Sequence, residues 1–253
     1  DLVRSRGLGD VYKRQPLALK LAGAQLRRKD PARWLKTFDA RKLKLRRTET
    51  LHDSLEQTFA LSIDELSGED WRCYTALAIF KEDEAIPFVA IAKLWGALAG
   101  LDEEETTDLL DDLAARALLQ LKDTPSGPVA TLHDLLRDFI TAELGEQDAL
   151  AAHRALLEAY RTTQTGEGWH TMPDDGYLYA HLAYHLYATS DYGALKALFD
   201  DDHWLHARVS ADDYIYDGYL ADLSLAWQWA QAATTSAKEV GFPLVIADCV
   251  HYA

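Results

Sequence analysis

The sequence predicts a mainly α-helical fold with one short β-hairpin. Apolar residues recur every three to four positions along most of the chain, which is the period of helices with one buried face. Two short apolar stretches, 118–121 and 129–132, flank a Pro- and Gly-containing segment, 123–128, and this pattern favours two strands joined by a turn. A hydrophobic content of 48% over 253 residues supports a packed core.

In the first half, each expected helix follows from its apolar spacing and end signals. Pro16 suits a first helical turn, with Leu17 and Leu21 on the buried face behind it. The three glutamates at 103–105 suit the positive end of a helix. The helices expected here are, in order, 16–26, 31–38, 51–64, 70–80, 87–95 and 103–117.

In the second half, amphipathic helices follow the hairpin, and Gly166 and Gly168 mark a boundary between two groups of them. The segment after this boundary is helical and rich in aromatic residues. The helices expected here are 135–144, 147–163, 177–188, 192–199, 204–209, 219–233 and 244–253. The last of them breaks off without a Gly, Pro or basic stop signal, which predicts a chain truncated at its C-terminus.

Charge is distributed unevenly along the chain. Residues 1–50 contain 15 Lys and Arg against 5 Asp and Glu, whereas 51–145 contain 6 against 20. The basic runs at 27–29 and 41–47 could bind nucleic acid, but the acidic composition of the neighbouring segment favours docking within the protein. Because DNA affinity rests on neutralising phosphates with Lys and Arg, we expect no nucleic-acid partner for 51–145.

The sequence contains no apolar run near the roughly 20 residues of a membrane span, and its N-terminus lacks a signal pattern. We therefore expect a cytoplasmic protein without a membrane partner. Cys73 and Cys249 lie in apolar helical patterns, so buried thiols are expected rather than a disulfide.

An isolated His-Asp pair, His133 and Asp134, lies where a short apolar strand turns into an amphipathic helix. Backbone N–H groups at a helix start carry partial positive charge, and a histidine beside them can add a donor to a phosphate oxygen. A structural interpretation is also open, in which Asp134 is the helix N-cap, as aspartate often is, and His133 is a half-buried filler.

The segment around this pair, 129–139, resembles the MHD motif that closes the winged-helix domain of NB-ARC ATPases, with Leu132 in place of Met. These STAND-class proteins include the apoptosome scaffold and plant resistance proteins. Residues 16–23 resemble the latter half of the family's GLPLAL motif, 54–95 resemble the opening of its winged-helix domain, and 169–207 resemble the helical arm of apoptosome-like proteins. Several matches in the family's order are more specific than any single one.

The resemblance implies four parts. Residues 1–15 are a non-native or disordered leader, because 10–15 resemble a translated adapter sequence. Residues 16–50 are the end of the first helical domain of NB-ARC plus a basic linker, 51–145 are the winged-helix domain, and 146–253 are the truncated helical arm. The implied partners are a missing N-terminal nucleotide-binding domain, C-terminal WD or HEAT repeats, and further copies of the protein on activation.

The expected activity is regulatory, with no catalytic residue in this chain. A phosphate-cradling G-x-x-x-x-G-K-[ST] loop is absent from the sequence, so we do not expect it to hydrolyse nucleotide unaided. The resemblance implies the lid side of an ADP/ATP pocket: Pro16 would pack on adenine or ribose, and His133 would hydrogen-bond the β-phosphate of ADP. Asp134 would shape the loop that presents His133. Arg14 and Gln15 replace the family's Gly-Leu before Pro16.

Two other classes of function fit parts of the sequence. A winged-helix transcription regulator would bind DNA with an affinity that falls steeply with salt. A zinc-dependent hydrolase would use His181 and His185, four apart on one helix face, although Leu182 stands where a catalytic glutamate is needed. Further potential ligands lie nearby in sequence, namely Asp174, Asp175, His203 and His206. Histidines bonded within an aromatic core explain the same pattern, so no bound metal is expected.

An aromatic cluster near the C-terminus allows two interpretations. Its members are Tyr214, Tyr216, Tyr219, Trp227 and Trp229. They could form a surface for a partner, or they could be interior packing, since aromatic residues bury large areas.

Overall fold

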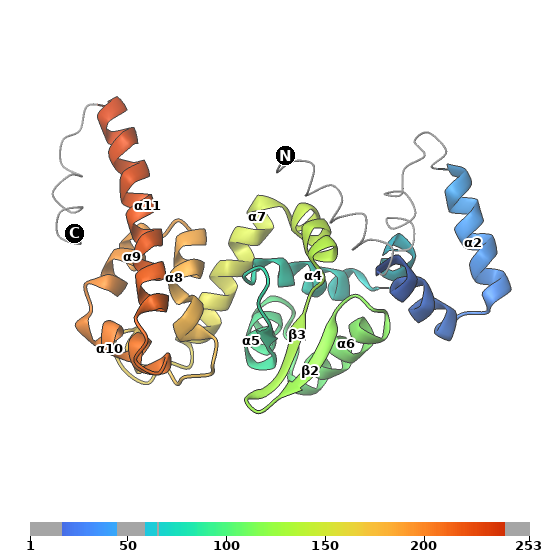
Figure 1. The fold of residues 1–253 in the computed structure, drawn as a ribbon, viewed down its shortest axis with the longest axis horizontal. Helices are drawn as coiled ribbons and strands as arrows, with labels where there is room; N and C mark the ends of the chain where they lie inside the picture. The colour runs from blue at the N-terminus through green and yellow to red at the C-terminus, as the bar shows by residue number, and fades with distance from the viewer. Residues whose placement is uncertain (1–16, 45–58, 65, 241–253) are drawn as a thin grey trace. The chain divides into compact units, whose positions relative to one another are not determined.

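The computed structural model describes residues 17–44, 59–64 and 66–240 (Figure 1). The fold is mainly α-helical with one small sheet, as predicted. The chain divides into two compact units: residues up to Trp95 with 99–145 form the first, and 96–98 with the residues from Glu146 onward form the second. Among the described residues, none of the helices combines the length and hydropathy needed to cross a membrane.

The helices of the first unit begin where the sequence supplies caps. Ser67 and Asp70 form a capping box at α4, and Asp102 and Glu105 form another at α6, so each pair satisfies two backbone N–H groups. The helical elements are 17–28, α2 (Pro31–Lys44), 59–63, α4 (Gly68–Ala76), η1 (Leu77–Ile79), α5 (Phe88–Ala99), α6 (Glu103–Ala115) and the start of α7 (Asp134–Arg161).

The sheet of this unit has the order β1-β3-β2, with all pairs antiparallel. Its strands are β1 (Ile86–Pro87), β2 (Gln120–Thr124) and β3 (Gly127–Thr131). The predicted hairpin is present, but its turn is shorter than expected because β2 and β3 continue their pairing up to Thr124 opposite Gly127. Strand β1 was not predicted, since two residues leave no alternating pattern to detect.

The core of the first unit lies between α4, α5 and the residues that lead into β2. Tyr74, Leu94, Trp95 and Leu118 are fully buried. The Tyr74 hydroxyl donates to the Leu118 carbonyl at 3.0 Å, and the Trp95 indole N–H donates to the Cys73 carbonyl at 2.8 Å. Both aromatic side chains therefore contribute apolar area without leaving a buried polar atom unsatisfied.

The helix at 17–28 packs within this unit through a buried polar bridge. The Gln25 amide nitrogen donates to the Ser62 hydroxyl at 2.7 Å, and its oxygen accepts from the Trp34 indole at 2.6 Å. Arg28 forms an ion pair with Asp112 of α6 at 3.0 Å. Arg28 of the basic run at 27–29 thus contacts an acidic residue within the same unit.

Gly145 divides α7 into two helices, because its φ of 70° is left-handed and non-helical. The break falls between the two helices expected at 135–144 and 147–163. The second unit contains the C-terminal part of α7, η2 (Trp169–Thr171), α8 (Leu178–Ala188), α9 (Tyr192–Phe199), α10 (Asp202–Ala211) and α11 (Asp217–Val240).

The core of the second unit surrounds α8, which contacts α9, α10 and α11. Trp204 is fully buried and its ring stacks on Tyr179 with 5.3 Å between centroids. The buried guanidinium of Arg208 donates to Asp222 at 3.0 Å and joins α10 to α11. The leader at 1–15, most of the expected helix at 51–64 and the one at 244–253 lie outside the described residues.

Candidate functional site

A pocket of about 210 Å³ in the first unit brings together two segments that are distant in sequence. Leu17 and Lys20 line it from the first helix, Gln120 lines it from β2, and Thr131 and His133 line it from the end of β3 and the start of α7. Residues 16–23 and 129–139, which resemble two motifs of one family, therefore meet at this pocket.

His133 is the N-cap of α7. Its carbonyl accepts from the backbone N–H groups of Leu136 at 2.8 Å and Arg137 at 2.9 Å. Its ring Nδ1 accepts from the backbone N–H of Leu135 at 3.3 Å. The ring proton of neutral His133 is therefore on Nε2, so the residue is a hydrogen-bond donor at that atom.

The structural interpretation of the His-Asp pair is wrong in one respect, because α7 starts at Asp134 and the capping residue is His133. Asp134 is half-buried. Pro16, the third residue predicted for this site, lies outside the described residues, but its neighbour Leu17 is buried and lines the pocket. The exposed ammonium of Lys20, which sequence reasoning did not select, adds positive charge there.

His181 and His185 do not form the zinc site that the hydrolase alternative needs. His185 is buried, with Nδ1 at 2.7 Å from Nδ1 of His153 and Nε2 at 2.7 Å from the Tyr177 hydroxyl. Both of its nitrogens are thus used inside the core, and the His181 ring packs on Tyr177 at 4.3 Å. Burial lowers the pKa of His153 to about 4, and it lowers the pKa of His185 well below the ordinary value.

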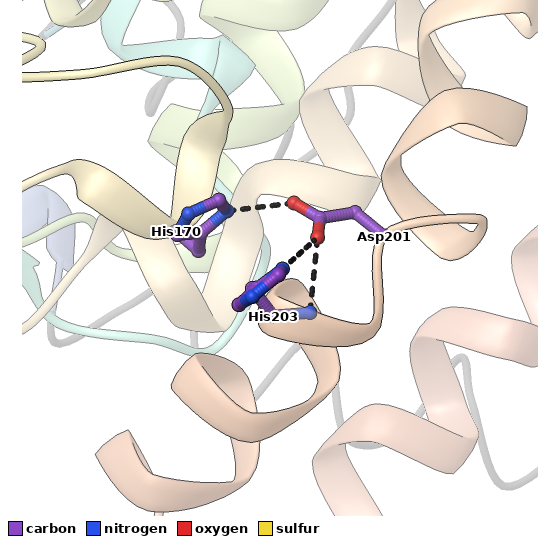
Figure 2. Close-up of side chains that lie close together, drawn as sticks. All are labelled: His170, Asp201 and His203. Atoms are coloured by element: carbon purple, nitrogen blue, oxygen red, sulfur yellow. Dashed lines mark hydrogen bonds and ion pairs between the residues drawn. The ribbon is translucent and has the colours of Figure 1, made fainter.

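A different cluster joins η2 to the start of α10 (Figure 2). Nδ1 of His170 lies 2.7 Å from Oδ2 of Asp201, and Nδ1 of His203 lies 3.1 Å from Oδ1. Asp201 also caps α10 by accepting from the His203 backbone N–H at 2.9 Å. Burial raises the pKa of Asp201, but the hydrogen bonds from His170 and His203 outweigh burial and leave that pKa below its ordinary value.

The sequence pattern places His203 near the potential zinc ligands, but His170 and Asp201 are not part of that pattern. Thirty-one residues separate His170 from Asp201, so no local spacing connects them. The one available signal was Asp201 itself, two residues before His203 at the start of an expected helix.

The C-terminal aromatic cluster separates into two groups. Trp229 stacks on Tyr192 with 4.3 Å between centroids, and Tyr219 packs edge-on against Phe199. In contrast, Tyr214 is 75% exposed, and two further members of the cluster, Tyr216 and Trp227, are exposed as well. Interior packing therefore explains only part of the cluster.

Comparison with known families shows which proteins this chain is similar to. Residues 150–217 match the family model of the APAF-1 helical domain, and these residues run from the second half of α7 to the start of α11. Together with the sheet-containing first unit, this match and the individual relatives identify the chain as similar to the C-terminal region of NB-ARC/STAND proteins.

The individual relatives come from animals and plants. The chain is 28% identical over 206 residues to apoptotic protease-activating factor 1 of Mus musculus, and this alignment covers 78% of the chain and 16% of that protein. It is 27% identical over 237 residues to a probable disease resistance protein of Arabidopsis thaliana, and this alignment covers 88% of the chain and 28% of that protein. The protease-activating factor of Danio rerio is 26% identical over 226 residues, with 86% of the chain and 17% of that protein covered. The chain thus spans 16% to 28% of the length of these relatives.

Proposed function

We propose that this chain is the regulatory and scaffold region of a STAND NTPase. It contributes the lid side of an ADP/ATP pocket and relays the nucleotide state to a C-terminal sensor of WD or HEAT repeats. In this proposal residues 16–50 end the first helical domain of NB-ARC and include its basic linker, 51–145 are the winged-helix domain, and 146–253 are the helical arm.

The observation that carries the proposal is the shared pocket at the start of α7. Leu17, Lys20 and His133 line it, and α7 begins with its positive end beside His133. Its volume of about 210 Å³ is below that of most small-molecule sites, which are roughly 300–1,000 Å³. Such a pocket suits one side of a nucleotide, and a separate nucleotide-binding domain supplies the phosphate-cradling loop.

Each predicted site residue has a distinct role in this proposal. The Nε2–H of His133 donates to the β-phosphate of ADP, and Asp134 fixes the first turn of α7 that presents His133. Pro16 packs on adenine or ribose, directly before the buried Leu17. ADP then holds this region onto the nucleotide-binding domain, and exchange for ATP removes the bridge and favours a second arrangement.

The proposal places the protein in the cytoplasm, where activation joins several copies into a homo-oligomer. The composition argues against a winged-helix transcription regulator that binds DNA, because residues 51–145 contain 20 acidic and only 6 basic side chains.

The test uses the complete protein, with this region and its nucleotide-binding domain together. Bound nucleotide is extracted from the purified protein and measured by anion-exchange chromatography. Wild type is expected to retain ADP and His133→Ala to lose most of it, whereas His206→Ala, an exposed histidine of the second unit, retains it. Equal ADP content in the His133 and His206 variants, or its absence from wild type, would contradict the proposal.

A further inference from the structure

Three side chains from two segments converge at the start of α10 (Figure 2). His170 comes from η2, Asp201 caps α10, and His203 lies in its first turn. Each offers one donor atom, and these three atoms all lie within 4.8 Å of one another. Donors bound to one zinc ion at about 2.0–2.2 Å are themselves roughly 3–4 Å apart. The His170 and His203 rings now stack with 4.9 Å between centroids, so both rings would rotate to bring all three atoms onto one ion.

We propose that His170, Asp201 and His203 form a binding site for a divalent transition-metal ion, of which zinc is the best match. Two imidazole nitrogens and a carboxylate oxygen are donors that suit Zn²⁺, Co²⁺ or Ni²⁺ better than Mg²⁺ or Ca²⁺, which prefer oxygen donors alone. Three protein ligands leave a fourth position for water. This site shares no residue with the pocket at His133.

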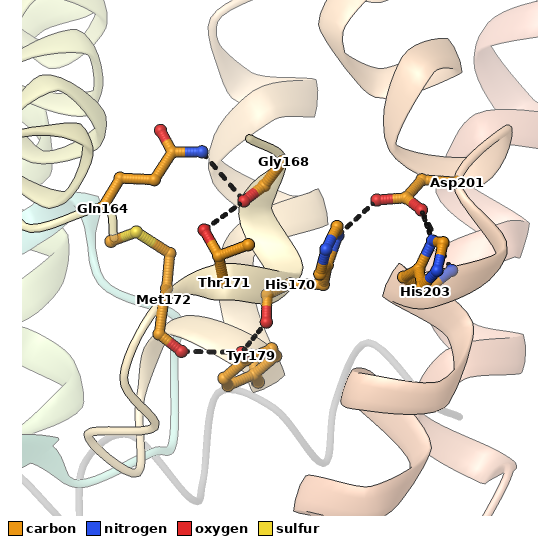
Figure 3. A network of polar contacts seen from close by, with 8 residues as sticks. All are labelled: Gln164, Gly168, His170, Thr171, Met172, Tyr179, Asp201 and His203. Carbon is orange, nitrogen blue, oxygen red and sulfur yellow. Dashed lines mark hydrogen bonds and ion pairs between the residues drawn. The ribbon is translucent and has the colours of Figure 1, made fainter. Parts of the chain in front are cut away.

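The segment that contains His170 is held in place without help from the cluster (Figure 3). The Tyr179 hydroxyl contacts the carbonyls of His170 at 3.0 Å and Met172 at 2.8 Å. The Gln164 amide and the Thr171 hydroxyl both donate to the Gly168 carbonyl at 2.8 Å. A site fixed by its surroundings has less conformational freedom to lose when an ion binds.

Gly168 allows the backbone to pass directly beside the cluster. Its φ of 84° is left-handed, and a Cβ built there would lie 2.8 Å from the His170 ring and 3.2 Å from Oδ2 of Asp201. Any larger residue would push the His170 ring away from Asp201. The glycine is therefore required by the close approach as well as by the backbone conformation.

The site is open to solvent on one side. The His203 side chain is 78% exposed, whereas those of His170 and Asp201 are only 26% exposed. An ion can thus reach the half-buried His170 and Asp201 from the side of His203, and it would replace the hydrogen bonds that now join both rings to the carboxylate. A bound ion would link η2 to α10 by coordinate bonds.

The first test is a calorimetric titration of the 253-residue chain with ZnCl₂ in excess MgCl₂. We expect one zinc ion per chain, and at least tenfold weaker binding in His203→Ala. Because the side chain of His203 is exposed, this variant keeps the fold, which circular dichroism verifies. The matched control is His206→Ala, an exposed histidine one turn further along α10, which keeps wild-type affinity.

Two further measurements connect any binding to the cluster itself. The Co²⁺ complex is expected to show the visible absorption of a four- or five-coordinate ion in wild type and to lose it in Asp201→Asn, which retains an oxygen for the helix cap. Gly168→Ala should weaken zinc binding, whereas Gly176→Ala, also left-handed but with open space around its Cβ, should not. Absence of one-to-one binding, or equal affinity in wild type and His203→Ala, would overturn the proposal. The three residues would then be joined by hydrogen bonds alone.

Discussion

The buried His153–His185 pair makes the second unit sensitive to acid, and its effect can be calculated from the structure. Burial depresses the pKa of His153 from 6.5 to about 4. Between these two values the unfolded chain takes up a proton that the folded chain does not, so stability is full above pH 6.5 and falls as the pH drops toward 4. Each pH unit in this window costs about 1.4 kcal/mol of stability through His153.

Lowering the pH from 7.5 to 5.0 should therefore cost about 2 kcal/mol through His153 alone. His185, whose pKa is also depressed by burial, adds a loss in the same direction. The assay is urea unfolding followed by circular dichroism at both pH values. His153→Gln removes one titrating group and keeps an amide that can bond His185, so its loss of stability between the two pH values should be about 2 kcal/mol smaller than that of wild type.

The matched control is His206→Gln, whose exposed side chain should leave the pH dependence at the wild-type value. If His153→Gln and wild type lose the same stability between pH 7.5 and 5.0, the account of this buried pair is refuted.

Three further predictions concern the backbone and the core. Gly145→Ala should destabilise the chain by about 1 kcal/mol, because the φ of Gly145 is left-handed. Gly23→Ala should stabilise it by up to about 1 kcal/mol, because Gly23 lies in a helix with open space at its Cβ. Urea unfolding that ranked the two variants in the opposite order would contradict this. Leu94→Ala should lower the free energy of unfolding by about 3 kcal/mol, because it opens a cavity at a fully buried site. Leu19→Ala, at an exposed site, should lower it by less than about 0.5 kcal/mol. Thermal unfolding measures both values, and equal losses in the two variants would contradict this prediction. Burial raises the pKa of the Cys73 thiol to about 11, so iodoacetamide at pH 8 should label it only after unfolding. Rapid labelling of Cys73 in the native chain, detected by peptide mapping, would contradict this.

Most of the fold could be predicted from local sequence patterns, because apolar spacing, capping residues and turn residues act over only a few positions of the chain. The apolar spacing of 103–117 and its acidic first turn predict a helix, and the structure places α6 at Glu103–Ala115 with a capping box at its start. The hairpin was predictable from two apolar stretches around a Pro- and Gly-containing turn. Strand β1 was not, because its two residues become a strand only by pairing with Val129 and Ala130, more than 40 positions further along the chain.

The pocket at His133 and the contacts of His185 form between residues that are far apart in the sequence, so local sequence patterns do not predict them. That Leu17 and His133 would meet could be expected only from the resemblance of two separate segments to one family. The spacing of His185 from His181 predicts a shared helix face, but the ring of His185 bonds to Tyr177 and to His153, which lies 32 positions away on another helix. Spacing on one helix shows which residues share a face, and it does not show what that face packs against.

We propose that His133 holds ADP in the closed state of the complete protein. The most direct test is the rate at which fluorescently labelled ADP dissociates from wild type, His133→Ala and the control His206→Ala. A hydrogen bond to a charged phosphate contributes about 1.5–3 kcal/mol, so His133→Ala should release ADP roughly 10- to 100-fold faster than wild type. If His133→Ala releases ADP at the same rate as wild type and the control, His133 does not contact the nucleotide and the proposed switch is contradicted.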